Sequence, residues 1–264
     1  MHEVTSSSCS DSGSVSPKQA LMWTLVFMVL FKLGFDASQN LKLPAVSSIT
    51  KKQLGLSDVE LFVPLPPNDD GYNEIVECLL PTAKMFWPMD QLRVLFMTDK
   101  EAGPKVIETF SEKLKSTLPD AKEVRVASNT PAVHLAGVGR QYGHNRQQYV
   151  MFWADNFTDA EYVAFWDTDA MFVTRVLDED LFDGNKPRVI AQMLAGTNNA
   201  MWEGRAENHR KTTGKIDVMN AMFYFPVVVR LSDLPYIRAS LMKSMDCQTF
   251  DQAFQKMLNI FDPH

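Results

Sequence analysis

The sequence predicts an α/β domain built around a mostly parallel sheet. From about Val59 onward, short apolar runs of strand length alternate with longer segments whose apolar residues recur at helical spacing. Polar residues follow several of these runs, as at Thr98 and Asp99, where the strands would end. No internal repeat of fixed period is visible, which excludes solenoids and propellers. These observations favour a single domain over residues 59–264.

Composition and charge narrow the classes of function. With 264 residues, 45% of them hydrophobic and 22% charged, the chain can bury a large core without metal or disulfide support. The formal net charge of −6 excludes a strongly basic nucleic-acid binder. Cys9, Cys78 and Cys247 are scattered and form no CxxC pair, so neither a structural zinc site nor a disulfide framework is indicated.

The N-terminal part of the chain differs in kind from the rest. Residues 1–18 contain a Ser-rich stretch and are expected to be a disordered tail. Residues 19–35 hold an apolar run, Ala20–Phe31, that is short for a bilayer span, but Lys32 can snorkel to the interface. We therefore expect a signal anchor, with a cleaved signal peptide and an ordinary buried helix as the alternatives. Residues 36–58 are expected to be a stem or linker.

The predicted strands and helices follow one another along the body of the chain. Val59–Leu65 predicts the first strand, because this apolar run ends in prolines that cannot continue a strand, and Asn68–Gly71 predicts a turn. Helical spacing of apolar residues predicts the helices, and compact apolar runs predict the other strands. The further elements expected are a helix over 74–86, a strand over 92–97, a helix over 104–118, a strand over 124–127, a helix over 145–157, strands over 162–166, 189–193 and 222–229, and helices over 234–245 and 250–261.

The most informative stretch is Tyr162–Val173, with the sequence YVAFWDTDAMFV. An apolar strand runs directly into two carboxylates, Asp167 and Asp169, and more apolar residues follow. Two acids bracketed by core residues are costly to keep ionised unless a cation or hydrogen-bond donors offset their charge. Mg²⁺ or Mn²⁺ would do so and would take further ligands from the phosphates of a substrate. The alternative is that Asp167 ends the strand and Asp169 caps a turn.

A polar helix that carries Arg146, Gln147 and Gln148 leads into this strand. Such a helix, followed by a strand that ends in DxD, resembles the GT-A nucleotide-diphospho-sugar glycosyltransferases. The resemblance covers roughly residues 59–255 and is most specific over residues 140–175. It implies a Rossmann-like GT-A domain of three α/β/α layers with a mostly parallel central sheet, preceded by an N-terminal hydrophobic helix.

The same resemblance implies an activity and its partners. It implies metal-dependent transfer of a sugar from a nucleotide-diphospho-sugar donor to a carbohydrate or glycoconjugate acceptor, with Mn²⁺ or Mg²⁺ as cofactor. Asp167 and Asp169 would serve the metal and the donor's diphosphate. The residues implied as further donor contacts are Asn68, Asp99, Arg146, Gln147 and Gln148. With the expected signal anchor, a single-pass type II membrane protein of the Golgi or another secretory compartment is expected, and a secreted or soluble protein is the alternative.

Three positions qualify the resemblance. Related helices often carry a Lys three residues after the second Gln, whereas this chain has Met151, so Arg140 or Arg146 would have to pair the phosphates. Asp251 is implied as the catalytic base, its alternative being an acid favoured at a helix N-terminus by the macrodipole. A terminal His264 after a proline fits a truncation point better than a metal ligand.

Two other functions are kept as alternatives. A haloacid-dehalogenase-type phosphatase also uses the aspartates of a DxD motif, the first as nucleophile. Its motif normally lies near the start of the catalytic domain, whereas here three strand-and-helix units precede Asp167. A catalytically inactive GT-A-like protein would bind a nucleotide sugar without turnover.

Overall fold

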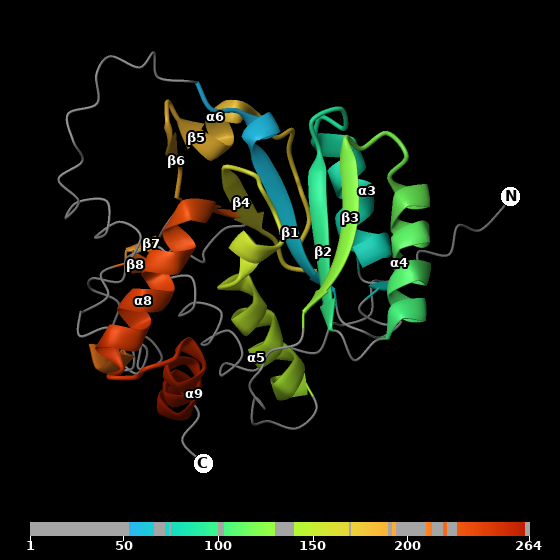
Figure 1. Cartoon of the computed structure of the whole chain (residues 1–264). Coiled ribbons are helices and arrows are strands. Elements are labelled where there is room, and N and C mark those ends of the chain that lie inside the picture. Colours follow the sequence, from blue (N-terminus) through green and yellow to red (C-terminus); the bar gives the residue numbers. More distant parts are fainter. Residues whose placement is uncertain are drawn as a thin grey trace, which may run out of the picture.

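A computed structural model describes most of the chain from residue 53 onward. The described residues are 53–65, 72–73, 75–99, 103–129, 140–168, 170–189, 192–193, 210–212, 219–220 and 226–261 (Figure 1). The expected tail at 1–18, the expected anchor at 19–35 and the expected turn at Asn68–Gly71 lie outside them. Within the described residues, no helix is long and apolar enough to cross a membrane.

Five strands form the central sheet in the order β3-β2-β1-β4-β9. They are β1 (Val59–Leu65), β2 (Arg93–Asp99), β3 (Glu123–Asn129), β4 (Tyr162–Phe165) and β9 (Val227–Arg230). β1 to β4 run parallel, and β9 pairs antiparallel with β4. Every residue of β1 and of β4 is buried, as expected of parallel strands that are covered on both faces. The prediction of an α/β domain with a mostly parallel sheet is confirmed.

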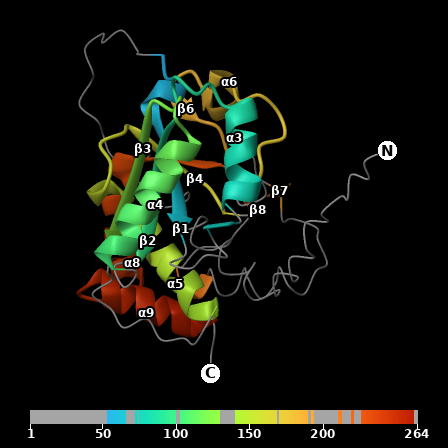
Figure 2. The same ribbon diagram turned by 90° about the vertical axis from the view of Figure 1, so that its right-hand side faces the viewer.

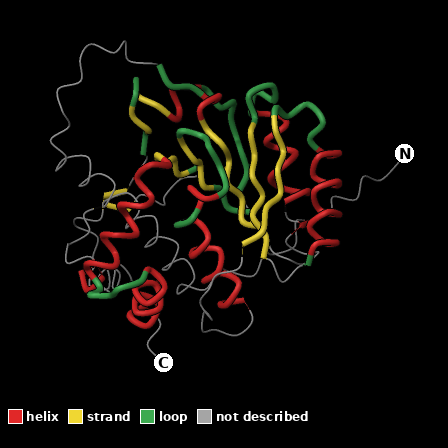
Figure 3. The backbone as a smooth tube through the Cα atoms, viewed as in Figure 1, coloured by secondary structure: helices red, strands yellow, loops and turns green. Residues whose placement is uncertain are grey.

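Helices and short turns connect these strands, as Figure 3 shows along the backbone. The helical elements are η1 (Leu56–Asp58), η2 (Ile75–Leu79), α3 (Leu80–Phe86), α4 (Pro104–Thr117), α5 (Arg140–Met151), η4 (Ala154–Asn156), α6 (Asp178–Leu181), η5 (Leu231–Asp233), α8 (Leu234–Ser244) and α9 (Phe250–Phe261). Outside the central sheet, β5 (Phe182–Asp183) pairs with β6 (Lys186–Pro187), and β7 (Gln192–Met193) pairs with β8 (Met219–Asn220).

Helices cover both faces of the sheet (Figures 1 and 2). The sheet therefore divides the buried core into two layers. One cluster of buried side chains joins α3 and α4 to the face that carries Leu61 and Phe96. The other joins α5, α8 and α9 to the face that carries Phe62 and Leu95. Because successive residues of a strand point to opposite faces, β1 and β2 supply both layers at once.

The structure corrects several predicted boundaries. The helix expected over 74–86 opens with the π-helical turn η2, because Pro81 has no N–H to donate to the carbonyl of Glu77. The strand expected over 189–193 is described only at Gln192–Met193, where it pairs with β8 and not with the central sheet. The strand expected over 222–229 is described at Val227–Arg230.

One helix and the expected stem also differ from expectation. The helix expected over 145–157 runs as α5 from Arg140 to Met151 and is followed by the separate turn η4. The last residues of the stem expected over 36–58 belong to the folded body, since Leu54 and Leu56 are buried in the cluster that contains α3 and α4.

A network of charges stabilises the amino-terminal end of the sheet. Glu60 of β1 is fully buried, and Arg125 of β3 reaches across β2 to donate to both of its carboxylate oxygens, at 3.2 and 2.6 Å. Arg125 also donates to the carbonyl of Phe157, which follows η4. Arg93 of β2 pairs with Glu123 at 3.0 Å and with the exposed Asp159 at 2.8 Å. The network therefore fastens the loop between η4 and β4 to the sheet.

The Arg125→Met substitution is expected to lower the free energy of unfolding by about 3–5 kcal/mol, because it leaves the buried carboxylate of Glu60 without its cation. Urea denaturation measures the loss. The double variant Glu60→Leu/Arg125→Met removes both charges and is expected to recover most of the stability. Asp159→Asn is the matched control, since an exposed ion-pair partner contributes little. Equal stability of the Arg125→Met protein and the wild type would contradict this account.

Candidate functional site

The carboxyl ends of the parallel strands meet at one edge of the sheet. In open α/β sheets, ligands bind beyond this edge, where the strand order reverses. Here the order reverses between β1 and β4, since β2 and β3 extend the sheet on one side of β1 and β4 lies on the other. Asp167 follows the last residue of β4 by two positions. The first aspartate of the DxD motif therefore lies at the place where the fold favours a ligand.

The loop around Asp167 is held in place by its neighbours. The indole N–H of Trp166 donates to the carbonyl of Ala170 at 3.1 Å, and its ring stacks on Phe172 with centroids 3.8 Å apart. Asp167 Oδ1 accepts the N–H of Thr168 at 2.9 Å. The half-buried carboxylate of Asp167 thus shapes its own turn, and its lone pairs also suit a metal ligand. Asp169 lies outside the described residues.

Helix α5 carries buried polar side chains. Because α5 connects the carboxyl end of β3 with the amino end of β4, its first turns lie toward the carboxyl edge of the sheet (Figure 1). Arg146 is 3% exposed and Gln148 is fully buried, while Gln147 is half-buried. Within the described residues, neither Oε1 nor Nε2 of Gln148 has a hydrogen-bond partner. Such a group costs about 1–3 kcal/mol unless a ligand, a water or a residue outside the described ranges meets it, so Gln148 is a candidate for a binding role.

The end of β2 carries a polar side chain, Thr98, that is not among the donor contacts expected from the sequence. Thr98 is 3% exposed, and its hydroxyl has no hydrogen-bond partner within the described residues. In the sequence, Thr98 directly precedes Asp99 at the end of an apolar run, and this position is the signal that points to it. Asp99 is the last residue of β2, and its side chain, like all of Asn68, is not described. β1 lies between β2 and β4, and Phe165 at the end of β4 is level with Leu95, three residues before Thr98.

Asp251 ties α9 to α5. It lies in the first turn of α9, and its Oδ1 accepts the hydroxyl of Tyr149 at 2.5 Å. The ring of Tyr149 packs edge-on against Phe254, with centroids 5.3 Å apart, and at a tilt against Phe250. Burial, and then the hydrogen bond and charge of Asp251, raise the pKa of Tyr149. This contact gives Asp251 a structural role next to Gln148, and its role as a catalytic base stays a prediction.

The described residues form no preassembled metal cage. Among them, no three His, Cys, Asp or Glu side chains gather in a group that could hold an ion. Mg²⁺ and Mn²⁺ that serve nucleotides need only one or two carboxylates, because waters and phosphates supply the other ligands. The half-buried Asp167 at the carboxyl edge fits that chemistry. Asp169 is the expected second ligand.

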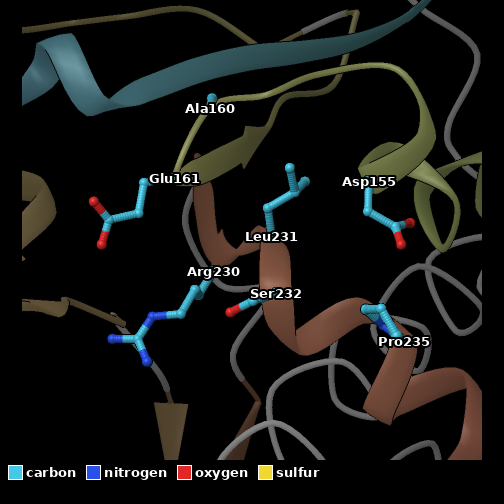
Figure 4. Close-up of a pocket in the computed structure, with 7 residues that line it drawn as sticks. All are labelled: Asp155, Ala160, Glu161, Arg230, Leu231, Ser232 and Pro235. Carbon is cyan, nitrogen blue, oxygen red and sulfur yellow. The ribbon is translucent and has the colours of Figure 1, made fainter.

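A pocket of about 540 Å³ lies at the opposite edge of the sheet (Figure 4). It is lined by Asp155, Ala160, Glu161, Arg230, Leu231, Ser232 and Pro235. Two of its charged groups already serve the fold, since Asp155 pairs with Arg238 at 2.6 Å and Arg230 donates to the hydroxyl of Tyr162 at 3.0 Å. The pocket adjoins the amino end of β4, whereas Asp167 follows its carboxyl end, so it is separate from the candidate site.

No family model and no curated protein matches the chain. Among solved structures, the chain is similar to the mannosyltransferase PcManGT from Pyrobaculum calidifontis in complex with GDP-Man and Mn²⁺, at 17% identity and a TM-score of 0.30. The similarity covers 60% of this chain and 41% of that chain. A likeness of this degree carries no argument about function.

The Tyr149–Asp251 contact predicts a dependence of stability on alkaline pH. The pKa of Tyr149 is raised above its ordinary value of 10.0, so the phenol stabilises the fold fully below pH 10. Above pH 10 this stability is lost, at up to about 1.4 kcal/mol per pH unit. Urea denaturation of Tyr149→Phe between pH 7 and pH 11 checks this. The variant is expected to be less stable by about 1.5 kcal/mol at pH 7 and to have a shallower alkaline decline.

Proposed function

We propose that this chain is a metal-dependent glycosyltransferase that moves a sugar from a nucleotide-diphospho-sugar donor to an acceptor. The observation that carries the proposal is the reversal of strand order between β1 and β4, with Asp167 just beyond the carboxyl end of β4. Three independent observations support the same site. They are the order of the strands, the buried polar side chains of α5 and the DxD sequence.

Asp167 and Asp169 are the residues that would hold Mn²⁺ or Mg²⁺. The ion would supply positive charge that neutralises the diphosphate as it leaves the sugar. The contacts of Trp166 with Ala170 and Phe172, and the hydrogen bond within the turn of Asp167, support this role for Asp167. A ligand that is held in position before the reaction keeps its geometry without a cost at the moment of reaction.

Arg146 and Gln148 bind the donor from α5. Arg146 brings a permanent positive charge whose guanidinium can pair two phosphate oxygens. Gln148 offers one acceptor and two donors from a buried position, which suits the polar edge of a sugar or a base. Met151 does not compete for this role, because its side chain is 1% exposed within the layer formed by α5, α8 and α9. Arg146 is then the phosphate-pairing cation of α5 whose side chain is described, and Arg140 at the start of the helix is the alternative.

Membrane attachment is part of the proposal. Residues 19–35 anchor the chain as a single-pass type II protein of the Golgi or another secretory compartment. The support for this is the apolar run Ala20–Phe31 with Lys32 at its end.

Asp167→Asn is expected to lower the rate of sugar transfer at least about 100-fold, since the metal's contribution to the transition state is several kcal/mol. A thermal-shift screen of nucleotide sugars with and without Mn²⁺ identifies the donor, and transfer from that donor is then measured. Asp183→Asn, which removes an exposed carboxylate of β5, is the matched control and is expected to act as the wild type.

Full transfer by Asp167→Asn would exclude the mechanism. Binding of a nucleotide sugar without transfer or hydrolysis by the wild type would instead favour a GT-A-like binding protein. Hydrolysis of an aryl phosphate would favour a phosphatase.

Gln148→Leu separates a binding role from a structural one. Replacing a buried amide that has no hydrogen-bond partner among the described residues by an apolar side chain of similar size is expected to raise the free energy of unfolding by about 1 kcal/mol. The same change is expected to weaken donor binding about tenfold, measured by calorimetry on the donor found by thermal shift. Gln255→Leu on α9, where the amide donates to Asn259 at 3.2 Å, is the control and should leave donor binding unchanged. A Gln148→Leu protein with wild-type donor affinity would remove Gln148 from the site.

A further inference from the structure

An extended segment after the candidate site runs along the outside of α3. The N–H of Phe172 donates to Thr82 Oγ1 at 3.1 Å, and the N–H of Val176 donates to the carbonyl of Phe86 at 2.9 Å. The side chains of Phe172 and Val176 are buried against the helix. In Figure 2 this segment passes beside α3 on its way to α6. Residues 170–177 are thereby fixed as a strap over the surface.

Large apolar side chains are exposed on this strap and on α3, with Thr174 and Arg175 also exposed on the strap. Met171, Val173 and Leu177 are 54%, 79% and 39% exposed, and Met85 of α3 is 72% exposed. These four are most of the large hydrophobic side chains that are exposed within the described part of the chain. We call Met85, Met171, Val173 and Leu177 the apolar ridge. Lys84 and Arg175, both exposed, alternate with its members along α3 and the strap.

The polypeptide enters the folded body next to this ridge. The N–H of Leu56 donates to Asp178 Oδ1 at 2.7 Å, and a Cβ on Gly55 would lie 3.0 Å from the same oxygen. Asp178 directly follows Leu177. Residues 36–52 are all that separates the apolar run at 19–35 from the described structure, and a chain of this length reaches at most about 60 Å. A membrane held through residues 19–35 therefore stays within reach of the ridge.

We infer that the apolar ridge rests on the lipid bilayer to which residues 19–35 attach the chain. The ridge inserts its methionine, valine and leucine side chains among the lipids, and Lys84 and Arg175 lie at the headgroups. Four side chains are too few for a stable dimer, which needs about 800 Å² from each partner. A surface on a tethered domain needs little affinity of its own, because the tether keeps the local concentration high. The acidic residues of α6 border the ridge and limit the contact there.

A fluorescent reporter tests this contact in the full chain. An environment-sensitive dansyl amino acid replaces Val173 in one protein and Tyr236 in another, since Tyr236 of α8 is 50% exposed away from the ridge. Each protein is reconstituted with phosphatidylcholine vesicles, with and without brominated acyl chains. The reporter at 173 is expected to shift to the blue and to be quenched by bromine at least twofold more than the reporter at 236. Met85→Ser in the same protein is expected to reduce the quenching at 173.

In protein that floats with the vesicles, absence of quenching at 173, or equal quenching at both positions, would overturn the inference. Protein that does not float with the vesicles would instead overturn the anchor, and the ridge contact with it. Circular dichroism verifies that each labelled protein is folded. The fluorescence does not depend on sugar transfer, so failure of the proposed transferase activity and failure of the ridge are separate results. The inference rests on the proposed anchor and not on the transfer chemistry.

Discussion

The handedness of the crossover connections is the constraint on which this fold depends. Parallel strands are almost always joined by right-handed crossovers. The connections from β1 to β2 and from β2 to β3 step in one direction, with α3 and α4 on one face of the sheet. The connection from β3 to β4 steps back past β2 and β1, so its helix α5 must cover the other face. The reversal that splits the core into two layers also opens the carboxyl edge between β1 and β4.

Near that edge the described residues include several buried or half-buried polar side chains. Arg146 and Gln148 are buried on α5, Thr98 is buried at the end of β2, and Asp167 is half-buried beyond β4. Thr98 and Gln148 have no side-chain hydrogen-bond partner among the described residues, and such groups reduce stability unless a ligand, a water or another part of the chain meets them. The charge network around Glu60 differs, because its members at the amino end of the sheet satisfy one another. The amino end of the sheet thus carries a charge network that stabilises the fold, whereas the carboxyl end carries the candidate site.

Local pattern predicted the regular elements well. β1 and α9 have the bounds expected from the sequence, since prolines close the first and a steady apolar spacing defines the second. The Tyr149–Asp251 contact could not be predicted, because it joins residues 102 positions apart through the packing of α9 on α5. The burial of Gln148 could not be predicted either, because in the sequence it is one polar residue among several in a polar helix. Such features depend on how elements pack, and a single sequence does not show this.

The most direct test of the central claim is where Mn²⁺ binds together with a nucleoside diphosphate. Methyl spectra of protein labelled at methionine distinguish the two edges of the sheet, because Met97 lies near the carboxyl end of β2 and Met89 precedes its amino end. With Mn²⁺ and the common nucleoside diphosphates, the paramagnetic ion is expected to broaden the signals of Met97 and Met171 and to spare that of Met89. Broadening of Met89 without Met97, or no broadening at all, would contradict a metal and nucleotide site at the carboxyl edge.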